Sequence, residues 1–194
     1  MARTRTFDPT VALTTAAEIF AAKGYSETSM EDLVQATGVS RYGLYGTFGN
    51  KRELFEAALE RFAESLGKAS FLKLLEPDAE LDQIRSIFYE RAEDMCNVRE
   101  NKGCLFIHTA MEMAPQDEEL RDVLQKFMKR MTKAFAIGLE TMRARGEVKR
   151  DLDIRTSAEL LTSTMFGLAV LGRTGFPKET LHGVIETTIA ALQD

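Results

Sequence analysis

Cysteine is scarce in this sequence, and its scarcity excludes a disulfide scaffold. The 194 residues include two cysteines, Cys96 and Cys104, which have neither CxxC spacing nor a secretory context. Two cysteines and two distant histidines also do not make up a structural zinc site. We therefore expect reduced thiols, no bound metal and no cofactor.

Long apolar runs are absent as well. No stretch approaches the length of a membrane span, and the first ten residues, MARTRTFDPT, lack the apolar core of a signal peptide. The sequence therefore predicts a soluble, cytoplasmic protein with no membrane partner. An apolar content of 44% is enough to bury a real core in one large domain, or in a small domain fused to a larger one.

Catalytic motifs are also missing. The sequence contains no GxSxG, no phosphate-binding loop, no HExxH and no pair of carboxylates with a defined cleft. Strand-like alternation, internal repeats and low-complexity tracts are absent too, whereas helical periodicity recurs along the chain. We predict an all-α protein that is not an enzyme.

The segment between residues 29 and 51 predicts two short helices around a glycine turn. Ser29 and Asp32 have capping-box spacing, which satisfies the free amides of a first helical turn. Gly38 supplies the turn, and Ser40 caps a second helix whose Leu44 points inward. This pattern is typical of a helix-turn-helix, and the residues that remain outward are Arg41, Tyr42, Tyr45 and Thr47.

The outward residues suit contact with DNA. Arg41 and Tyr42 open the second helix, where side chains reach base edges most easily, and arginine can bind guanine through two hydrogen bonds. The alternative for both is an ordinary solvated face. Along the sequence, Arg41, Lys51 and Arg52 have no acidic neighbour before Glu53, so we expect positive charge toward the phosphates and salt-sensitive binding.

Four further residues suit contact with DNA on chemical grounds. Ser29 and Ser40 are first of all helix caps, but caps on this surface can also donate to phosphates. Arg3 and Arg5 lie on a basic amino-terminal arm that suits a minor groove, although flexible basic ends are common.

The segment from Phe7 to Leu59 resembles the amino-terminal domain of the TetR family of bacterial transcription regulators. The resemblance lies in AAEIFAAKGYSETSMEDLVQATGVS and LYGTFGNKRELF, and it covers about the first third of the chain. It implies a homodimeric one-component regulator, usually a repressor, in which Tyr45 and Lys51 clamp the DNA backbone. Gly46 and Thr47 stand where members often carry bulky residues, which predicts a flexible end of the second helix.

The rest of the chain predicts a larger helical domain. We expect a three-helix helix-turn-helix DNA-binding domain over residues 1–50, followed over residues 51–194 by a helical domain for effector binding and dimerisation, with about nine helices in all. The last two helices are strongly apolar, which favours a four-helix bundle formed by two copies of the chain. The alternative is that both helices complete a monomeric core.

The segment GCLFIHTAMEMAP resembles a TetR subgroup whose members answer reactive electrophiles or, in one case, copper. Cys104, His108 and Met111 are spaced so that they share one helical stripe. A nearby histidine and a helix start favour the reactive thiolate, and the same set would suit cuprous copper. Packing or pocket lining is the more ordinary interpretation of these residues.

Methionine and phenylalanine are plentiful beyond residue 60, where they suit an adaptable apolar cavity or an ordinary core. We predict that a small apolar ligand binds there and releases the protein from a palindromic operator. The alternatives are a thiol sensor based on Cys104 and a helical partner-binding module that does not bind DNA. Besides His108, the predicted pocket walls are Phe62, Phe88, Met131, Phe135 and Met165.

Overall fold

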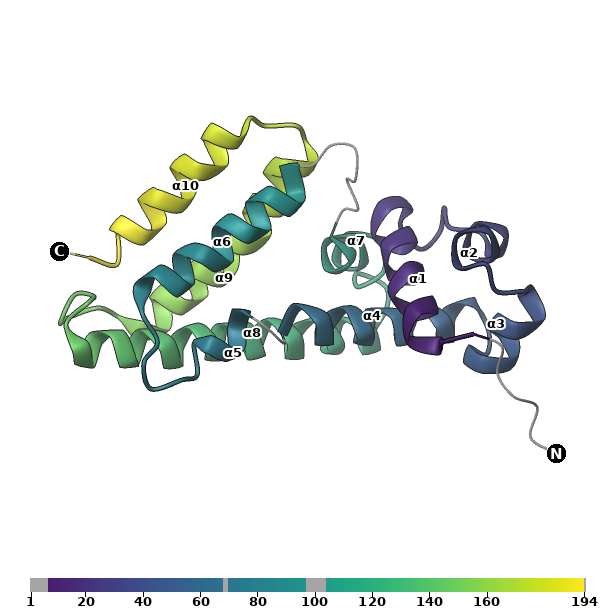
Figure 1. Ribbon diagram of the computed structural model, residues 1–194, viewed down its shortest axis with the longest axis horizontal. Helices are drawn as coiled ribbons and strands as arrows, with labels where there is room; N and C mark the ends of the chain where they lie inside the picture. The colour runs from purple at the N-terminus through teal and green to yellow at the C-terminus, as the bar shows by residue number, and fades with distance from the viewer. Residues whose placement is uncertain (1–6, 68–69, 97–103, 194) are drawn as a thin grey trace. The chain divides into compact units, whose positions relative to one another are not determined.

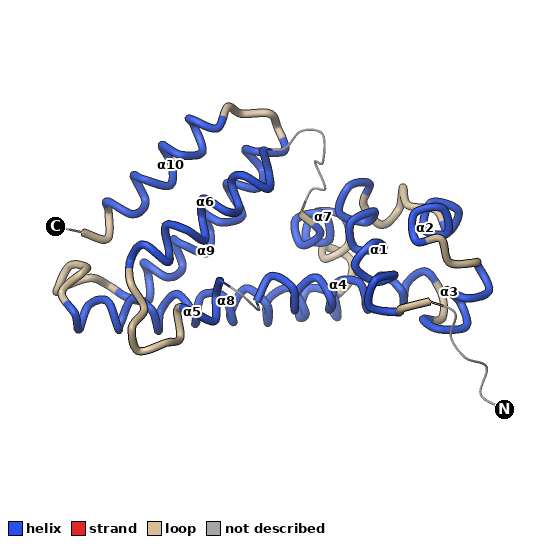
Figure 2. Tube along the Cα trace, viewed as in Figure 1, coloured by secondary structure: helices blue, strands red, loops and turns tan. Residues whose placement is uncertain are grey.

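A computed structural model describes residues 7–67, 70–96 and 104–193 of the protein. Within these ranges the chain is helical and contains no strand, as Figure 2 shows, which confirms the predicted all-α class. The helices are α1 (Pro9–Lys23), α2 (Met30–Thr37), α3 (Arg41–Phe48), α4 (Lys51–Gly67), α5 (Ser70–Lys73), α6 (Leu81–Cys96), α7 (Leu105–Glu112), α8 (Glu118–Arg145), α9 (Ile154–Arg173) and α10 (Lys178–Ala190).

The chain divides into two compact units. The head unit comprises residues 1–65 and 102–121, and the bundle unit comprises residues 66–101 and 122–194. The head unit therefore contains α7 and the first turn of α8 in addition to the helix-turn-helix (Figure 1). The predicted domain boundary at residue 50 stays a prediction.

The start and end of α1 follow from its capping residues. Asp8 accepts a hydrogen bond from the Thr10 amide at 2.8 Å, and Pro9 occupies the first turn, where a missing amide costs nothing. Gly24 ends the helix with a φ of 84°, a conformation that favours glycine.

The core of the head unit forms around Phe20. Its side chain is fully buried and meets the ring of Phe55 on α4 edge to face, with centroids 5.0 Å apart. The ring of Tyr25 packs against the same pair. These contacts fasten α1, the α1–α2 loop and α4 to one another, and α7 packs against α1.

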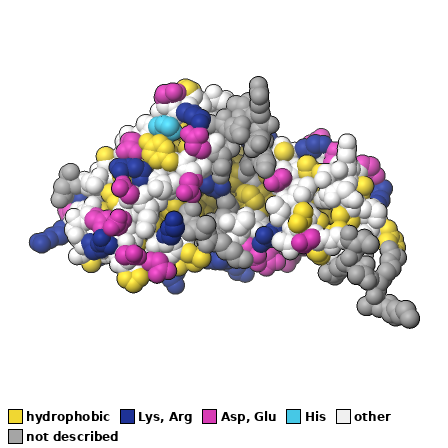
Figure 3. All heavy atoms as spheres, in the orientation of Figure 1, with side chains coloured by type: hydrophobic (Ala, Val, Ile, Leu, Met, Phe, Trp, Pro, Cys, Tyr) yellow, Lys and Arg dark blue, Asp and Glu magenta, His cyan; other side chains and the backbone are white. Residues whose placement is uncertain are grey.

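The bundle unit is held together by α6, α9 and α10, which pack against one another. Phe135 on α8 is fully buried and contacts the rings of Phe71 and Phe88, with centroids 5.2 and 6.0 Å away. On the face drawn in Figure 3, acidic and basic side chains are mixed over this unit. Its ion pairs include Arg85–Glu186 and Lys178–Glu93. Exposed pairs of this kind contribute little to stability, so burial of apolar side chains dominates the fold.

Candidate nucleic-acid interface

The first helix of the helix-turn-helix is closed at both ends. The Ser29 hydroxyl accepts from the Asp32 amide at 3.1 Å, and the Asp32 carboxylate accepts from the Ser29 amide at 2.8 Å. This reciprocal pair is the predicted capping box. Gly38 then ends α2 with a φ of 67°, and the buried Val39 fills the angle between α2 and α3.

The second helix, α3, is anchored on one side only. The Ser40 hydroxyl accepts from the Gly43 amide at 3.1 Å, and the Leu44 side chain is 1% exposed. On the other side, Tyr42 is 72% exposed and Tyr45 is 40% exposed, while Gly46 is exposed and Thr47 is half-buried. The helix therefore presents polar and aromatic groups outward from a fixed base, as the sequence predicted.

Arg41 is the basic residue of this exposed face. Its guanidinium lies 2.8 Å from the Glu31 carboxylate on α2 and 5.8 Å from the centroid of the Tyr45 ring. The expectation that Arg41 has no acidic neighbour is wrong in space, because adjacent helices bring together residues ten positions apart. The two side chains are 58% and 71% exposed, so the pair is weak enough for a phosphate or a base edge to replace.

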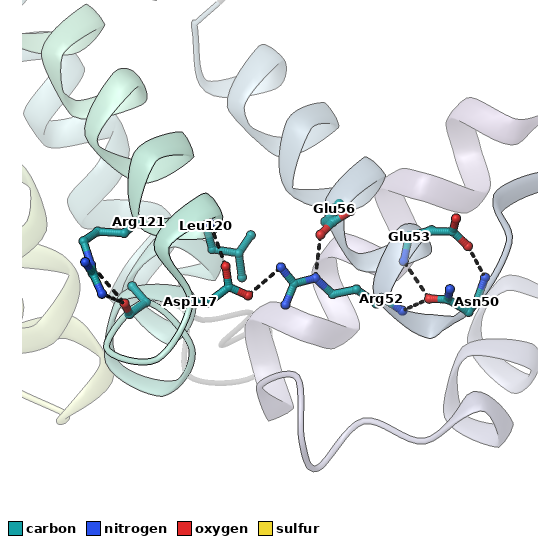
Figure 4. Close-up of polar contacts among 8 residues, drawn as sticks. Asn50, Arg52, Glu53, Glu56, Asp117, Leu120 and Arg121 are labelled. Atoms are coloured by element: carbon teal, nitrogen blue, oxygen red, sulfur yellow. Dashed lines mark hydrogen bonds and ion pairs between the residues drawn. The ribbon is translucent and has the colours of Figure 1, made fainter.

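The start of α4 directly follows α3. Asn50 accepts from the amides of Arg52 and Glu53 at 2.8 and 3.1 Å, and Glu53 accepts from the Asn50 amide at 2.7 Å (Figure 4). These reciprocal bonds cap the start of α4. The ammonium of Lys51 lies 4.4 Å from the centroid of the Tyr25 ring, which defines its direction.

Arg52 does not offer the charge expected from the sequence. Its guanidinium forms ion pairs with Glu56 at 2.5 Å and with Asp117 at 2.6 Å. These two carboxylates already neutralise it, so Lys51 and Arg41 remain the cationic candidates for contact with phosphates. Arg3 and Arg5 of the predicted arm lie outside the described residues.

The predicted effector residues fall in both units. Phe62, Cys104, His108 and Met111 belong to the head unit, whereas Phe88, Met131, Phe135 and Met165 are buried in the bundle unit. Cys104 is half-buried and stands at the amino end of α7, and Phe62 packs against Phe106 with centroids 5.7 Å apart. Their roles stay predictions, except that Met111 is 77% exposed and therefore does not line a buried cavity in its unit.

A surface groove of about 600 Å³ lies between α8 and α9 in the bundle unit. Met128, Ala136, Ile154 and Ala158 supply apolar walls, and the lining also includes Thr132, Lys129, Lys133, Glu140, Arg155 and Glu159. None of the predicted pocket residues lines this groove. Helical periodicity predicts which side chains are buried but not where neighbouring helices diverge, so the sequence contained no signal for it.

Sequence reasoning also missed Glu112, at the end of α7. Its carboxylate accepts from the amides of Tyr25 and Ser26 at 2.8 and 2.6 Å. The partners are 87 and 86 positions away along the chain, and no local pattern announces a contact of that separation. The contact joins α7 to the α1–α2 loop within the head unit.

Two glycines of α3 provide a matched test of how this helix packs. We expect Gly46→Ala to raise the free energy of unfolding by about 0.5–1 kcal/mol, because alanine favours helix and its methyl group has open space. We expect Gly43→Ala to lower it by about 1–2 kcal/mol, because the new Cβ would lie 2.9 Å from Val39 Cγ1. Urea unfolding of both variants measures the two changes, and equal changes in both would contradict the packing described.

Asp32 makes the stability of the head unit dependent on pH. The hydrogen bond from Lys23, at 2.5 Å, and those from Ser29 hold the pKa of the Asp32 carboxyl far below its ordinary range. A group whose pKa is depressed by folding stabilises the fold above its unfolded pKa of about 4, and this contribution is lost as the pH falls toward the folded pKa.

We therefore expect Asp32→Asn to lower the melting temperature at pH 7, and the difference from the wild type to shrink as the pH falls below about 4. Thermal unfolding between about pH 3 and 7 measures this trend, with Glu27→Gln, an exposed carboxylate in the same unit, as the control. A difference that stays constant across that range would show that the charge of Asp32 contributes nothing.

Three packed helices, of which one presents an exposed face with basic and aromatic side chains, are the hallmark of helix-turn-helix DNA-binding proteins. Two family models match the chain. Residues 12–58 match the bacterial regulatory proteins of the tetR family, and residues 80–185 match the tetracyclin repressor-like C-terminal domain. The chain belongs to the tetR family and is a DNA-binding transcriptional regulator.

Individual relatives extend over nearly the whole chain. The uncharacterized HTH-type transcriptional regulator YezE of Bacillus subtilis (strain 168) is 30% identical over 193 residues, which cover 99% of this chain and 100% of YezE. The HTH-type transcriptional repressor ComR of Escherichia coli (strain K12) is 26% identical over 188 residues, which cover 96% of this chain and 90% of ComR.

A solved structure with the same fold contains DNA. It is a cysteine mutant of the TetR family transcriptional regulator CifR, complexed with 26-bp double-strand operator DNA. The similarity has a TM-score of 0.83 at 26% identity and covers 97% of this chain and 99% of the CifR chain.

Among the described residues, no helix combines the length and the apolar character that crossing a bilayer requires.

Proposed function

We propose that this regulator binds a palindromic operator as a homodimer, acts as a repressor, and is released by a small apolar ligand. The observation that carries the proposal is the exposed face of α3, which is fixed from behind by the buried Leu44 and by the Ser40 cap. A helix that is anchored on one side and presents polar groups on the other fits the major groove of DNA. The similarity to CifR, which is complexed with double-strand operator DNA, supports binding to an operator.

The exposed side chains divide into two roles. Arg41 and Tyr42, in the first turn of α3, read base edges, and Arg41 exchanges its weak pair with Glu31 for a guanine. Tyr45 and Lys51 bind phosphates, because a phenol and an ammonium suit the backbone and carry no sequence information. Ser40 and Thr47 add donors beside them, whereas the predicted contact of Ser29 competes with the bond that its hydroxyl donates to the Asp32 carboxylate at 2.7 Å.

The outer faces of α9 and α10 support dimerisation. Leu160 and Val170 on α9 are 47% and 48% exposed, although both are apolar. Gly167 on α9 and Gly183 on α10 are exposed, and apart from the adjoining residues and the backbone of the same helix no atom lies within 4 Å of the position that a Cβ would occupy. Small and apolar residues on one surface suit close packing against the same surface of a second copy, which gives a four-helix bundle.

Repression and release follow from the geometry of such a dimer. Two copies of α3 related by a twofold axis match half-sites about one helical turn apart. A ligand that binds more tightly to a conformation of the dimer in which the two α3 helices are spaced differently releases the operator. A ligand with equal affinity for both conformations has no effect. The groove between α8 and α9, with its apolar walls, is a place where such a ligand can bind.

A thiol sensor is the second candidate for the effector response. Cys104 is half-buried at the amino end of α7, where the helix dipole favours the thiolate, and His108 lies one turn further along. Promoter release by the wild type and by Cys104→Ser is compared after treatment with an electrophile such as N-ethylmaleimide. If the serine variant responds as the wild type does, the thiol sensor is excluded and a reversible ligand remains.

The operator proposal is tested by titrating the purified protein against a palindromic fragment from its own promoter, with a scrambled fragment of equal length as the control. We expect a selective complex of two chains per fragment that weakens steeply as salt rises. Binding that is absent, or equal for both fragments, would favour a partner-binding module instead. As such a regulator the protein acts in the cytoplasm and by binding, not as an enzyme.

A further inference from the structure

We propose that Glu112 and Asp117, which flank the loop between α7 and α8, are positioning residues for DNA binding. They hold the α1–α2 loop and the first turn of α4 so that Lys51 faces the phosphate backbone. This inference rests on the DNA-binding function proposed above, and it assigns a role to two carboxylates that do not themselves face DNA.

Glu112 holds the α1–α2 loop. Its two carboxylate oxygens accept from the amides of Tyr25 and Ser26, at 2.8 and 2.6 Å. Gly24 leaves room for this contact, because a Cβ there would lie 2.7 Å from Glu112 Oε2. The Glu112 side chain thus makes two charge-assisted bonds to consecutive backbone groups, and it fixes the position of the loop relative to α7.

The Glu112 carboxyl is ionised at neutral pH. Its burial acts to raise the pKa, but hydrogen bonds from Ser26 and from the Tyr25 amide outweigh this effect and hold the pKa below its ordinary value. The negative charge is therefore present under the conditions in which the protein would meet DNA.

Tyr25 passes this constraint to Lys51. The residue whose amide binds Glu112 also places its ring 4.4 Å from the Lys51 ammonium, measured to the ring centroid. The ring itself is fixed between Phe20 and Phe55, with centroids 6.2 and 5.0 Å away. Because Tyr25 cannot move independently of its amide, Glu112 determines where the surface that guides Lys51 lies.

Asp117 holds the neighbouring residue directly. One of its oxygens lies 2.6 Å from the Arg52 guanidinium, and the other accepts from the Leu120 amide at 3.0 Å, as Figure 4 shows. Asp117 thereby caps the first turn of α8 and at the same time grips the first turn of α4. Glu112 thus acts on Lys51 through Tyr25, and Asp117 acts on the next residue, Arg52, by direct contact.

The direction in which DNA affinity changes when the charge of Glu112 is removed distinguishes a positioning role from simple electrostatics. Removing a negative charge from a DNA-binding unit strengthens its attraction to phosphates if nothing else changes. If Glu112 positions Lys51, its removal instead weakens binding, because Lys51 is no longer held toward the backbone. Glu112→Gln therefore gives opposite results under the two explanations.

The test is a double-mutant cycle on operator affinity, measured by fluorescence anisotropy at several salt concentrations with the full chain. We expect Lys51→Ala to weaken binding about 10-fold and to reduce the salt slope by about two, one for each chain of the homodimer. We expect Glu112→Gln to weaken binding about 3- to 10-fold and to reduce the slope in the same direction. In the Lys51→Ala background, we expect Glu112→Gln to change affinity by less than about twofold.

The matched control is Glu119→Gln, which removes the same charge from an exposed position in the first turn of α8. We expect this variant to bind the operator as tightly as the wild type or slightly more tightly. Unaltered or tighter binding by Glu112→Gln, or a loss of the same factor with and without Lys51, would overturn the proposal.

Two further arms keep the outcome decisive. If Glu112→Gln does not fold, as judged by its helical circular dichroism, Asp117→Asn takes its place in the same cycle, because asparagine keeps the cap of α8 but loses the charge that binds Arg52. If the wild type itself shows no selective binding, the proposed function has failed, whereas selective wild-type binding with an additive cycle refutes only the positioning role.

Discussion

Replacing Phe20 with alanine is expected to lower the free energy of unfolding of the head unit by about 3–5 kcal/mol. The side chain is fully buried and lies between the rings of Tyr25 and Phe55. Its removal leaves a cavity where α1, the α1–α2 loop and α4 meet, and it also abolishes the edge-to-face contact at 5.0 Å. Urea unfolding of the full chain, followed by circular dichroism, measures the loss.

Val11→Ala is the matched control for this prediction, because Val11 lies on the same helix but is 62% exposed. We expect it to change the free energy of unfolding by less than about 0.5 kcal/mol. If Phe20→Ala were as mild as its control, the core described for the head unit would be wrong.

The double variant Arg41→Ala/Tyr42→Ala is expected to bind the operator at least about 100-fold more weakly than the wild type. Each side chain that reads a base edge contributes about 1–3 kcal/mol of discrimination, and a homodimer loses both contacts twice. The fold should be unaffected, because Tyr42 is 72% exposed and Arg41 forms only a surface pair with Glu31. Fluorescence anisotropy with specific and scrambled fragments measures the loss.

Arg150→Ala controls for the change of net charge, because Arg150 is an exposed residue of the bundle unit. We expect its affinity for the operator to stay within about twofold of the wild type. A double variant that keeps its preference for the operator over the scrambled fragment would show that α3 does not read bases.

Local patterns were enough to predict the helix-turn-helix. The Ser29–Asp32 capping box, the left-handed Gly38 and the inward Leu44 all depend on residues within a few positions of one another. Caps, turns and helical periodicity are short-range features of a chain, so they can be found in the sequence. The outward orientation of Tyr42 and Tyr45 follows from the same periodicity.

The charges around this site could not be predicted in the same way. The pair between Arg41 and Glu31, and the one between Arg52 and Asp117, join helices whose packing the sequence does not specify. Each pair removes positive charge that a count along the chain assigns to the DNA-binding surface. The Glu112 contact is a further case, because its partners lie more than eighty positions away.

The prediction of effector-binding residues from the sequence has a similar limit. The spacing of Cys104, His108 and Met111 predicted a shared stripe on α7, but spacing alone does not tell whether a stripe faces a cavity or the solvent, and Met111 is 77% exposed. The groove between α8 and α9 depends on how these two helices pack, and its lining includes small side chains such as Ala136. Neither property leaves a periodic mark in the sequence.

The most direct test of the central claim, that α3 enters the major groove, is methylation protection of the operator by the full-length protein. Dimethyl sulfate modifies guanine N7 in the major groove and adenine N3 in the minor groove, so one experiment reports on both. We expect protection of guanines in two half-sites about one helical turn apart, and loss of that protection in the Arg41→Ala/Tyr42→Ala variant. Protection confined to adenines, or guanine protection that persists in the variant, would contradict the account.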